Sequence, residues 1–183
     1  MNKGKFIVIS GPSGVGKDTI CEGLIKRGNG IYSVSMTTRK KRNNEIDGVN
    51  YFFVSKDEFE NKIKDNFFLE YAMYNGNYYG TPTDFISDNT NRGINVFAVL
   101  EINGAINVKK IFPSAITIYI MPPSFDELER RLRGRKSEDD DIINERLNIA
   151  KEEVKYKDKY DYVVINSTVD NAVLEIEKII NNC

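Results

Sequence analysis

The chain has 183 residues, with 26 Lys and Arg against 27 Asp and Glu. This length suits one compact domain, and the balanced charge gives no overall field that would draw the protein to nucleic acid or to an anionic membrane. The chain has no histidine and only two cysteines, which excludes a Ser-His hydrolase and removes the usual zinc ligands. No run of about 18 apolar residues occurs, and the first residues lead directly into a strand pattern, so we expect a cytoplasmic protein without a membrane span.

Four apolar segments predict strands that are buried on both faces of a sheet. They are residues 5–10, 95–100, 115–121 and 160–165. Segments with helical spacing separate them, beginning with a helix expected at about 17–27. This alternation predicts an α/β fold with a parallel sheet flanked by helices.

Three further helix starts are marked by a Ser or Thr that is followed three residues later by an acidic residue. In such a capping box the hydroxyl accepts a hydrogen bond from a free N–H of the first turn. Pro82, expected in the first turn of the second of these helices, strengthens that prediction. The three pairs are Ser55 with Glu58, Thr81 with Asp84, and Ser124 with Glu127.

Two segments interrupt the alternating pattern. Residues 33–83 contain short, aromatic-rich, strand-like pieces around one helix, which indicates an inserted lobe. Residues 134–141 form a polar break between two helices, which indicates a lid. We therefore expect a single domain over residues 1–183, with a core at about 1–32, 84–133 and 146–183, the lobe at about 33–83 and the lid at about 134–145.

The sequence GPSGVGK at residues 11–17 matches the phosphate-loop pattern G-x-x-x-x-G-K. It follows a predicted strand and opens a predicted helix, as a P-loop NTPase-type fold requires. Glycines let successive backbone N–H groups turn inward toward phosphate oxygens, and the lysine reaches the β- and γ-phosphates. The predicted ATP-binding residues of this segment are Gly11, Pro12, Ser13, Gly14, Val15, Gly16, Lys17, Asp18 and Thr19.

Asp18 departs from the usual pattern, in which a Ser or Thr hydroxyl after the lysine contacts Mg²⁺. A carboxylate here either holds Mg²⁺ through water or faces solvent in the first helical turn, where negative charge is tolerated. Repulsion from phosphate favours the solvent-facing alternative unless a metal intervenes. Thr19 is then the nearest hydroxyl.

The predicted lobe carries candidate groups for a phosphorylated acceptor. Arg39 and Arg42 are three residues apart, a spacing that can close on one phosphate from two sides. With Lys40 and Lys41 between them they equally fit a solvated basic run. Glu70 interrupts an apolar stretch, where a carboxylate is costly unless it is paired. The adjacent N1–H and amino donors of guanine would match such a carboxylate.

Motifs of one known family extend over the whole chain. SVSMTTRKKR, YFFV, FLEYA and GNYYGTP follow the phosphate loop, and Gly104-Ala105, PPS, RLRGR and YDYVVIN come after them. With GPSGVGK, this series resembles the guanylate kinase family along essentially its full length. The pattern TTR-x-x-R together with GNYYGTP is its most specific part.

The resemblance implies an enzyme that uses ATP and Mg²⁺ to phosphorylate GMP, and dGMP, to GDP in guanine nucleotide synthesis and recycling. It implies that the GMP phosphate is held by Ser35, Arg39, Arg42, Tyr51 and Tyr79. Guanine would be read by Glu70 and Thr81. The transferring phosphoryl group would be clamped by Lys17, Arg39, Arg135 and Arg146. Asn166 would lie on the adenine side.

The family pattern also places two acidic residues at the end of the strand before Gly104-Ala105, and this chain has Val99 and Glu101 there. Glu101 matches the second acid, which contacts guanine or organises Mg²⁺-bound water. Because the first acid is missing, we predict no strong protein ligand for the metal. Asp18, Thr19 or Glu101 would contact it directly or through water.

Two alternatives to this function stay open at this point. One is a kinase for another small phosphorylated acceptor, since the scaffold is shared with adenylate, thymidylate and shikimate kinases. The other is a non-catalytic guanylate-kinase-like module that binds protein partners. Glu70, Thr81 and the arginine spacing argue against the first, and the intact phosphate loop argues against the second. The sequence is compatible with a monomer or a homodimer.

Overall fold

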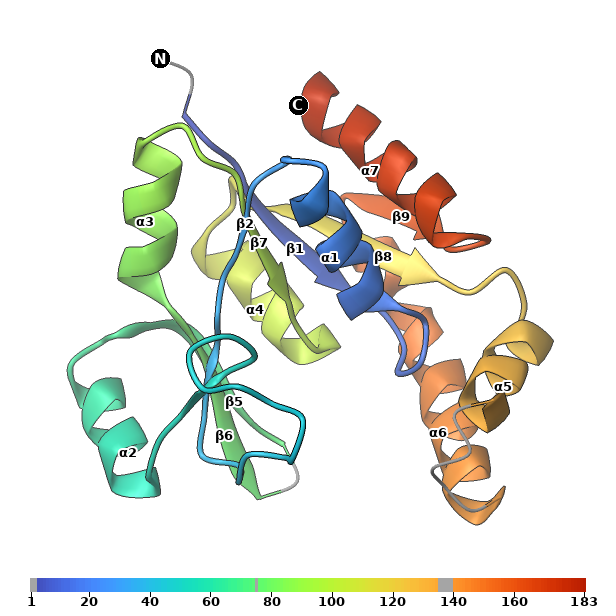
Figure 1. Cartoon of the computed structure of the whole chain (residues 1–183), viewed down its shortest axis with the longest axis horizontal. Coiled ribbons are helices and arrows are strands. Elements are labelled where there is room, and N and C mark those ends of the chain that lie inside the picture. The colour runs from blue at the N-terminus through green and yellow to red at the C-terminus, as the bar shows by residue number, and fades with distance from the viewer. Residues whose placement is uncertain (1–2, 75, 135–139) are drawn as a thin grey trace.

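The structure is a computed structural model that describes residues 3–74, 76–134 and 140–183 (Figure 1). Its larger sheet has five parallel strands in the order β2-β7-β1-β8-β9. Along the sheet these are β2 (Ile31–Tyr32), β7 (Val96–Val99), β1 (Phe6–Ser10), β8 (Ile116–Met121) and β9 (Tyr162–Ile165). The four predicted core strands are confirmed, each one or two residues shorter than expected.

Helices cover both faces of this sheet, as continuous apolar strands require. On one face lie α1 (Lys17–Lys26) and α7 (Val169–Asn182), where Ile20, Leu24 and Ile176 pack against alternate residues of β1. On the other lie α3 (Thr83–Asn91) and α4 (Ile102–Ile111). All five residues of β1 are buried, so the segment that leads into the phosphate loop is fixed on both sides.

The inserted segment forms a second, four-stranded sheet in the order β4-β3-β6-β5. Its elements are β3 (Met36–Thr37), β4 (Phe52–Phe53), α2 (Lys56–Lys64), β5 (Phe68–Tyr74) and β6 (Asn77–Pro82). Phe59 of α2 stacks on Phe68 and Tyr78, with ring centroids 4.3 and 5.1 Å apart. This aromatic stack joins the helix to one face of the small sheet and leaves the other face to the polar residues predicted to bind substrate.

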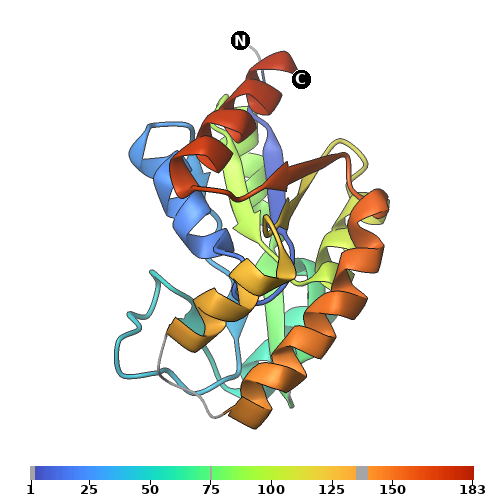
Figure 2. The same ribbon diagram turned by 90° about the vertical axis from the view of Figure 1, so that its right-hand side faces the viewer.

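A helical hairpin lies on the opposite side of the phosphate loop from this lobe (Figure 1). It consists of α5 (Phe125–Gly134) and α6 (Asp140–Glu153), which share a small apolar core, and the 3₁₀ helix η1 (Val154–Lys159) leads back to β9. Figure 2 shows α6, in orange, running along one side of the molecule up to the segment that leads into β9. The loop after β1 is therefore flanked by the lobe and by the hairpin.

One predicted helix start is wrong. Ser55 and Ser124 do cap helices, accepting hydrogen bonds from the backbone N–H groups of Glu58 and Glu127 at 3.2 and 3.1 Å. Thr81 does not, because it lies within β6 and the helix begins two residues later. Its hydroxyl donates instead to Glu70, a tertiary partner that outcompetes the local cap.

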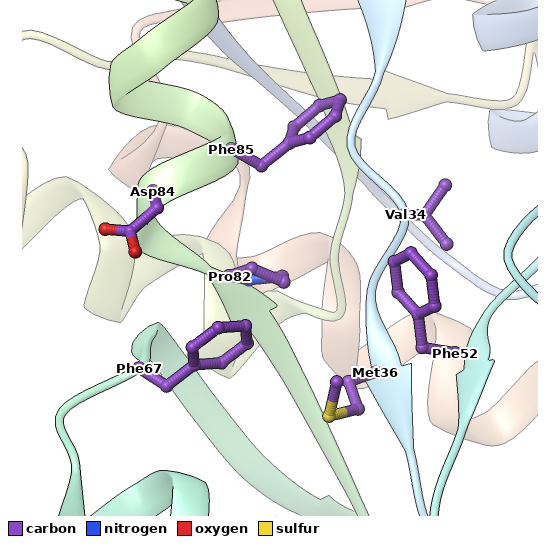
Figure 3. A pocket seen from close by; sticks show the side chains of 7 residues that line it. All are labelled: Val34, Met36, Phe52, Phe67, Pro82, Asp84 and Phe85. Carbon is purple, nitrogen blue, oxygen red and sulfur yellow. The ribbon is translucent and has the colours of Figure 1, made fainter.

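An apolar hollow of about 290 Å³ lies where the chain passes between core and lobe (Figure 3). Val34 lines it on the segment between β2 and β3, which enters the lobe, and Pro82 at the end of β6 and Phe85 in α3 line it where the chain returns to the core. Met36 and Phe52 close it from the small sheet. Both covalent connections of the lobe thus border the same hollow. No helix within the described ranges is long and apolar enough to cross a membrane.

Candidate active site

The phosphate loop folds tightly between β1 and α1. Gly11 approaches β8 so closely that a Cβ there would lie 2.4 Å from the Ile120 carbonyl oxygen. Gly16 caps α1 with φ 97°, a left-handed conformation that disfavours other residues. The sequence expectation of a loop that opens directly into a helix therefore holds in detail.

Lys17 is the first residue of α1 and only 9% exposed. Its Nζ donates to the carbonyl oxygens of Gly11 and Pro12 at 2.6 and 3.2 Å. The ammonium group is thus folded over its own loop, where the backbone already holds it. Asp18 and Thr19, also in the first turn, are both exposed.

A polar hollow of about 460 Å³ adjoins the loop between α5 and the turn after β9. Its lining includes Gly16, Thr19, Arg131 and Asn166. Asn166 is 2% exposed, and its Nδ2 donates to the Val15 carbonyl oxygen at 2.8 Å. Arg131 donates to the Asn166 carbonyl oxygen at 3.0 Å. Asn166 therefore supports the phosphate loop through its side chain, and its place on the adenine side stays a prediction.

The arginine predicted to bind the acceptor phosphate is held by a residue that we did not predict. Arg39 forms a bidentate ion pair with Glu45, with NH2 and NH1 to carboxylate distances of 2.7 and 3.0 Å. The Arg42 backbone N–H donates to the same carboxylate at 2.8 Å. Such a pair fixes the plane of the guanidinium. Glu45 escaped notice because it follows a basic run, although an acid six residues after Arg39 is a detectable signal.

Two tyrosines that were predicted to hold the acceptor phosphate lie close to Arg39. The guanidinium carbon lies 5.5 Å from the Tyr51 ring centroid, and the rings of Tyr51 and Tyr79 are 5.9 Å apart. Burial, with the charge of Asp18 next in importance, raises the pKa of Tyr51 to about 12, so the Tyr51 hydroxyl stays a protonated donor at neutral pH. Arg39, Tyr51 and Tyr79 form one donor cluster.

Glu70 and Thr81 form the second cluster of the lobe. Glu70 is 8% exposed, and it accepts a hydrogen bond from the Thr81 hydroxyl at 2.9 Å. Its Oε2 lies against α4, where a Cβ on Gly104 would be only 3.1 Å away. Burial raises the pKa of Glu70, and the Thr81 bond partly opposes that rise. The carboxylate is thus paired on one oxygen only in what the structure describes.

The remaining predicted residues surround these clusters. Ser35 is buried beside β3, whereas Arg42 and Glu101 are exposed, Glu101 at the start of α4. Arg146 is half-buried on α6. Arg135 lies outside the described residues. Besides burial, the charges of Asp18 and Glu101 both raise the pKa of Tyr51, so the first turn of α1, the start of α4 and Tyr51 of the lobe lie within electrostatic reach of one another.

The acidic residues predicted to contact a metal are few and do not form a cluster in the described residues. No group of three or more His, Cys, Asp or Glu suited to a metal occurs in residues 3–74, 76–134 and 140–183. Exposed carboxylates of Asp18 and Glu101 and the hydroxyl of Thr19 are oxygen donors, which suit a hard cation that keeps most of its water. The donors present therefore fit outer contacts to Mg²⁺ better than a closed cage.

Comparison with known proteins identifies relatives of the chain along its whole described length. The guanylate kinase family model matches residues 3–183. Guanylate kinases of Halalkalibacterium halodurans and Clostridium acetobutylicum are 48% and 47% identical to the chain over 97% of its length, covering 88% and 85% of those proteins. The crystal structure of guanylate kinase from Anaplasma phagocytophilum superposes with a TM-score of 0.81 at 31% identity, covering 99% of this chain and 86% of that one.

A more distant likeness concerns the scaffold alone. A shikimate kinase from Bacteroides thetaiotaomicron shares 11% identity at a TM-score of 0.51. The motifs, the two clusters of the lobe and the full-length matches distinguish the chain from that kinase. The protein belongs to the guanylate kinase family.

Proposed function

We propose that this protein transfers the γ-phosphoryl group of ATP to a phosphate oxygen of GMP, giving ADP and GDP. The observation that carries the proposal is Glu70, a buried carboxylate with one oxygen bonded to Thr81. Guanine presents two adjacent N–H donors, whereas adenine presents an acceptor at the corresponding ring nitrogen. Glu70 can therefore pair with guanine and would be left unsatisfied by adenine.

The donor nucleotide would occupy the phosphate loop. Inward backbone N–H groups and Lys17 would hold the β- and γ-phosphates, for which the ammonium must leave the Gly11 carbonyl. The hollow beside Asn166 and Arg131 would take the adenosine part. Mg²⁺, when bound between the phosphates, would neutralise charge, and Asp18, Thr19 and Glu101 would hold its water.

The acceptor would occupy the lobe. Arg39, Tyr51 and Tyr79 would bind the GMP phosphate together with Ser35 and Arg42. Every acceptor contact proposed here is to phosphate or base, so dGMP is proposed as a second acceptor. The lobe at about 33–83 would close over the core, and the segment at about 134–145 would act as a lid that excludes water.

Catalysis would come from positioning and charge neutralisation. The phosphoryl group passes between two oxygens with charge spread over its three others, and it requires no covalent protein intermediate. Lys17, Arg39, Arg135 and Arg146 would surround that charge. The absence of histidine is compatible with such a reaction.

A coupled assay of ADP release tests the proposal, with ATP and Mg²⁺ and with GMP, dGMP, AMP, dTMP, shikimate or no acceptor. We expect turnover with GMP and dGMP only, and loss of that selectivity in Glu70→Gln. Turnover with a different acceptor would establish another small-molecule kinase. Saturable GMP binding without turnover would favour the non-catalytic module.

A further inference from the structure

Two threonines come directly before the arginine proposed to bind the GMP phosphate. Thr37 is the last residue of β3, and Thr38 lies between it and Arg39. Both belong to the pattern TTR-x-x-R, in which the proposed function assigns a role only to the arginines. Threonine suits a strand because it is β-branched, and its hydroxyl can bond backbone groups nearby. The contacts of these two hydroxyls therefore indicate what the pair does.

The Thr37 hydroxyl connects two parts of the lobe. Thr37 is completely buried, and its Oγ1 donates to the Tyr78 carbonyl oxygen of β6 at 2.8 Å. The same oxygen accepts a hydrogen bond from the Arg39 backbone N–H at 3.2 Å. One buried hydroxyl thus joins the backbone of β6 to the backbone of Arg39.

Thr38 holds the same residue of β6. Its Oγ1 accepts a hydrogen bond from the Tyr78 N–H at 2.9 Å, and its backbone N–H donates to the Tyr78 carbonyl oxygen at 3.1 Å. The ring of Tyr78 is fixed as well, because it stacks on Phe59 of α2. Both backbone polar groups of Tyr78 are therefore bonded to the two threonines.

These bonds lie where the sheet itself gives little restraint. The strand β3 has only two residues, and in its ladder with β6 Thr37 lies opposite Tyr79. A ladder this short specifies register weakly, and a slip by one residue would turn the Tyr79 ring to the opposite face of the sheet. The hydroxyl bonds at Tyr78 extend the pairing by one residue and oppose such a slip. They keep Tyr79 on the face where its ring lies 5.9 Å from that of Tyr51.

We propose that Thr37 and Thr38 are positioning residues for the phosphorylated acceptor. They hold β3 against β6 and so set the guanidinium of Arg39 relative to the hydroxyl of Tyr79. This inference rests on the proposed function, in which these two donors bind the same phosphate of GMP. Loss of a threonine hydroxyl should weaken GMP binding, because the donors must then be ordered when GMP binds, and it should leave ATP binding unchanged.

Substitutions at Thr37 separate the hydroxyl from the shape of the side chain. Thr37→Val keeps the branched shape and removes the hydroxyl, whereas Thr37→Ser keeps the hydroxyl and removes the methyl group. We expect KM for GMP to rise about tenfold in the Val variant and to stay within about threefold in the Ser variant, with KM for ATP within about twofold in both. A Val variant with wild-type KM for GMP, or a Ser variant as weak as Val, would overturn the inference.

Thr90→Val is the matched control. Thr90 of α3 is 2% exposed, and its hydroxyl donates to the Ile86 carbonyl oxygen at 2.8 Å, so this substitution also removes a buried hydroxyl bond. Its melting temperature should fall as that of Thr37→Val does, with KM for GMP unchanged. A raised KM in the control would overturn the inference, because KM would then follow stability in general.

Thr38→Val decides if Thr37→Val fails to fold, since Thr38 is only half-buried. It removes the acceptor of the Tyr78 N–H, and we expect KM for GMP to rise about fivefold and to recover in Thr38→Ser. A Thr38→Val variant with wild-type KM for GMP would overturn the inference.

A double variant tests whether Thr37 acts through Arg39. In an Arg39→Ala background, Thr37→Val should raise KM for GMP by less than about a further threefold, because the group that it positions is already gone. A full further tenfold rise would overturn the inference. Wild type without GMP-dependent turnover would instead refute the proposed function, and GMP binding measured by calorimetry, weakened about tenfold in Thr37→Val if the inference is right, would still test the positioning.

Discussion

Arg39 is proposed to bind a substrate phosphate, yet its guanidinium already carries a carboxylate partner. Glu45 accepts hydrogen bonds from NH1 and NH2, and the guanidinium carbon lies 5.5 Å from the centroid of the Tyr51 ring. The ion pair is only about 16% exposed on either side chain, so solvent screening is reduced. Glu45 thus fixes the orientation of Arg39 before any phosphate binds.

We therefore predict that Glu45→Ala raises KM for GMP about tenfold and lowers kcat less, because a freely rotating arginine must be ordered on binding. Glu45→Gln should fall between Ala and wild type. Glu177→Ala is the matched control, since Glu177 of α7 makes a similar bidentate pair with Arg27 and neither residue belongs to the proposed site. Steady-state kinetics check this, and a KM unchanged by Glu45→Ala would contradict it.

Glu70, the residue proposed to recognise guanine, lowers the stability of the folded protein when its buried carboxyl group is ionised. Its pKa is raised in the folded protein, chiefly by burial, and the unfolded chain ionises at the ordinary value. Ionisation therefore destabilises the native state above the folded pKa, and this penalty disappears as the pH falls through it.

We predict that Glu70→Gln melts at a higher temperature than wild type at pH 7, and that the difference shrinks as the pH is lowered. The same variant should lose at least a hundredfold in kcat/KM for GMP, because an amide keeps only one acceptor oxygen and sets its NH2 group against a guanine N–H donor. Thermal melts at several pH values and initial rates check both parts. A variant less stable than wild type at pH 7 would show that the buried charge is fully compensated.

At the scale of elements, what could be predicted depended on whether the signal was local. The strand β1 and the phosphate loop were predicted because a buried run and a glycine pattern are contiguous. The strands β2 and β3 have two residues each, too few for periodicity to register. Thr81 was misassigned as a helix cap because its partner Glu70 is eleven residues away.

The first turn of α1 carries the chain's most visible departure from the usual phosphate loop. Asp18 is exposed there, and its charge contributes, after burial, to the raised pKa of Tyr51 in the lobe. If it faces solvent, it repels polyphosphate, and Mg²⁺ relieves that repulsion. If it holds the water of Mg²⁺, it takes over the role of the first acidic residue of the family pattern, whose position in this chain is occupied by Val99.

We predict that Asp18→Asn lowers KM for ATP about threefold at limiting Mg²⁺ and leaves it unchanged at saturating Mg²⁺, as expected for removal of a like charge. The measurement is a series of ATP titrations at fixed Mg²⁺ concentrations, with Glu22→Gln, one turn further along α1, as the control. A higher Mg²⁺ requirement in the Asn variant would instead assign Asp18 a role in holding the metal.

At the scale of the whole molecule, the two halves of the proposed reaction lie on separate bodies. The loop and Asn166 belong to the core, and Arg39 and Glu70 belong to the lobe. Two chain segments connect core and lobe, one through Val34 and the other through Pro82. The hollow in Figure 3 lies between these two crossings. Transfer requires the two phosphates to come together, and the proposed closure of the lobe over the core would bend the chain in this region.

We predict that Val34→Phe, which places a ring in the hollow of about 290 Å³, lowers kcat without lowering the melting temperature. The larger side chain fills space between the two crossings and restricts their relative motion, so closure should slow kcat by about tenfold while KM for GMP changes little. Val34→Ala enlarges the hollow, leaves the crossings free to move, and should keep kcat within about twofold of wild type. A Phe variant with wild-type kcat would mean that closure bends the chain elsewhere, and a Phe variant with raised KM and low stability would mean that the ring distorts the lobe and does not restrain it.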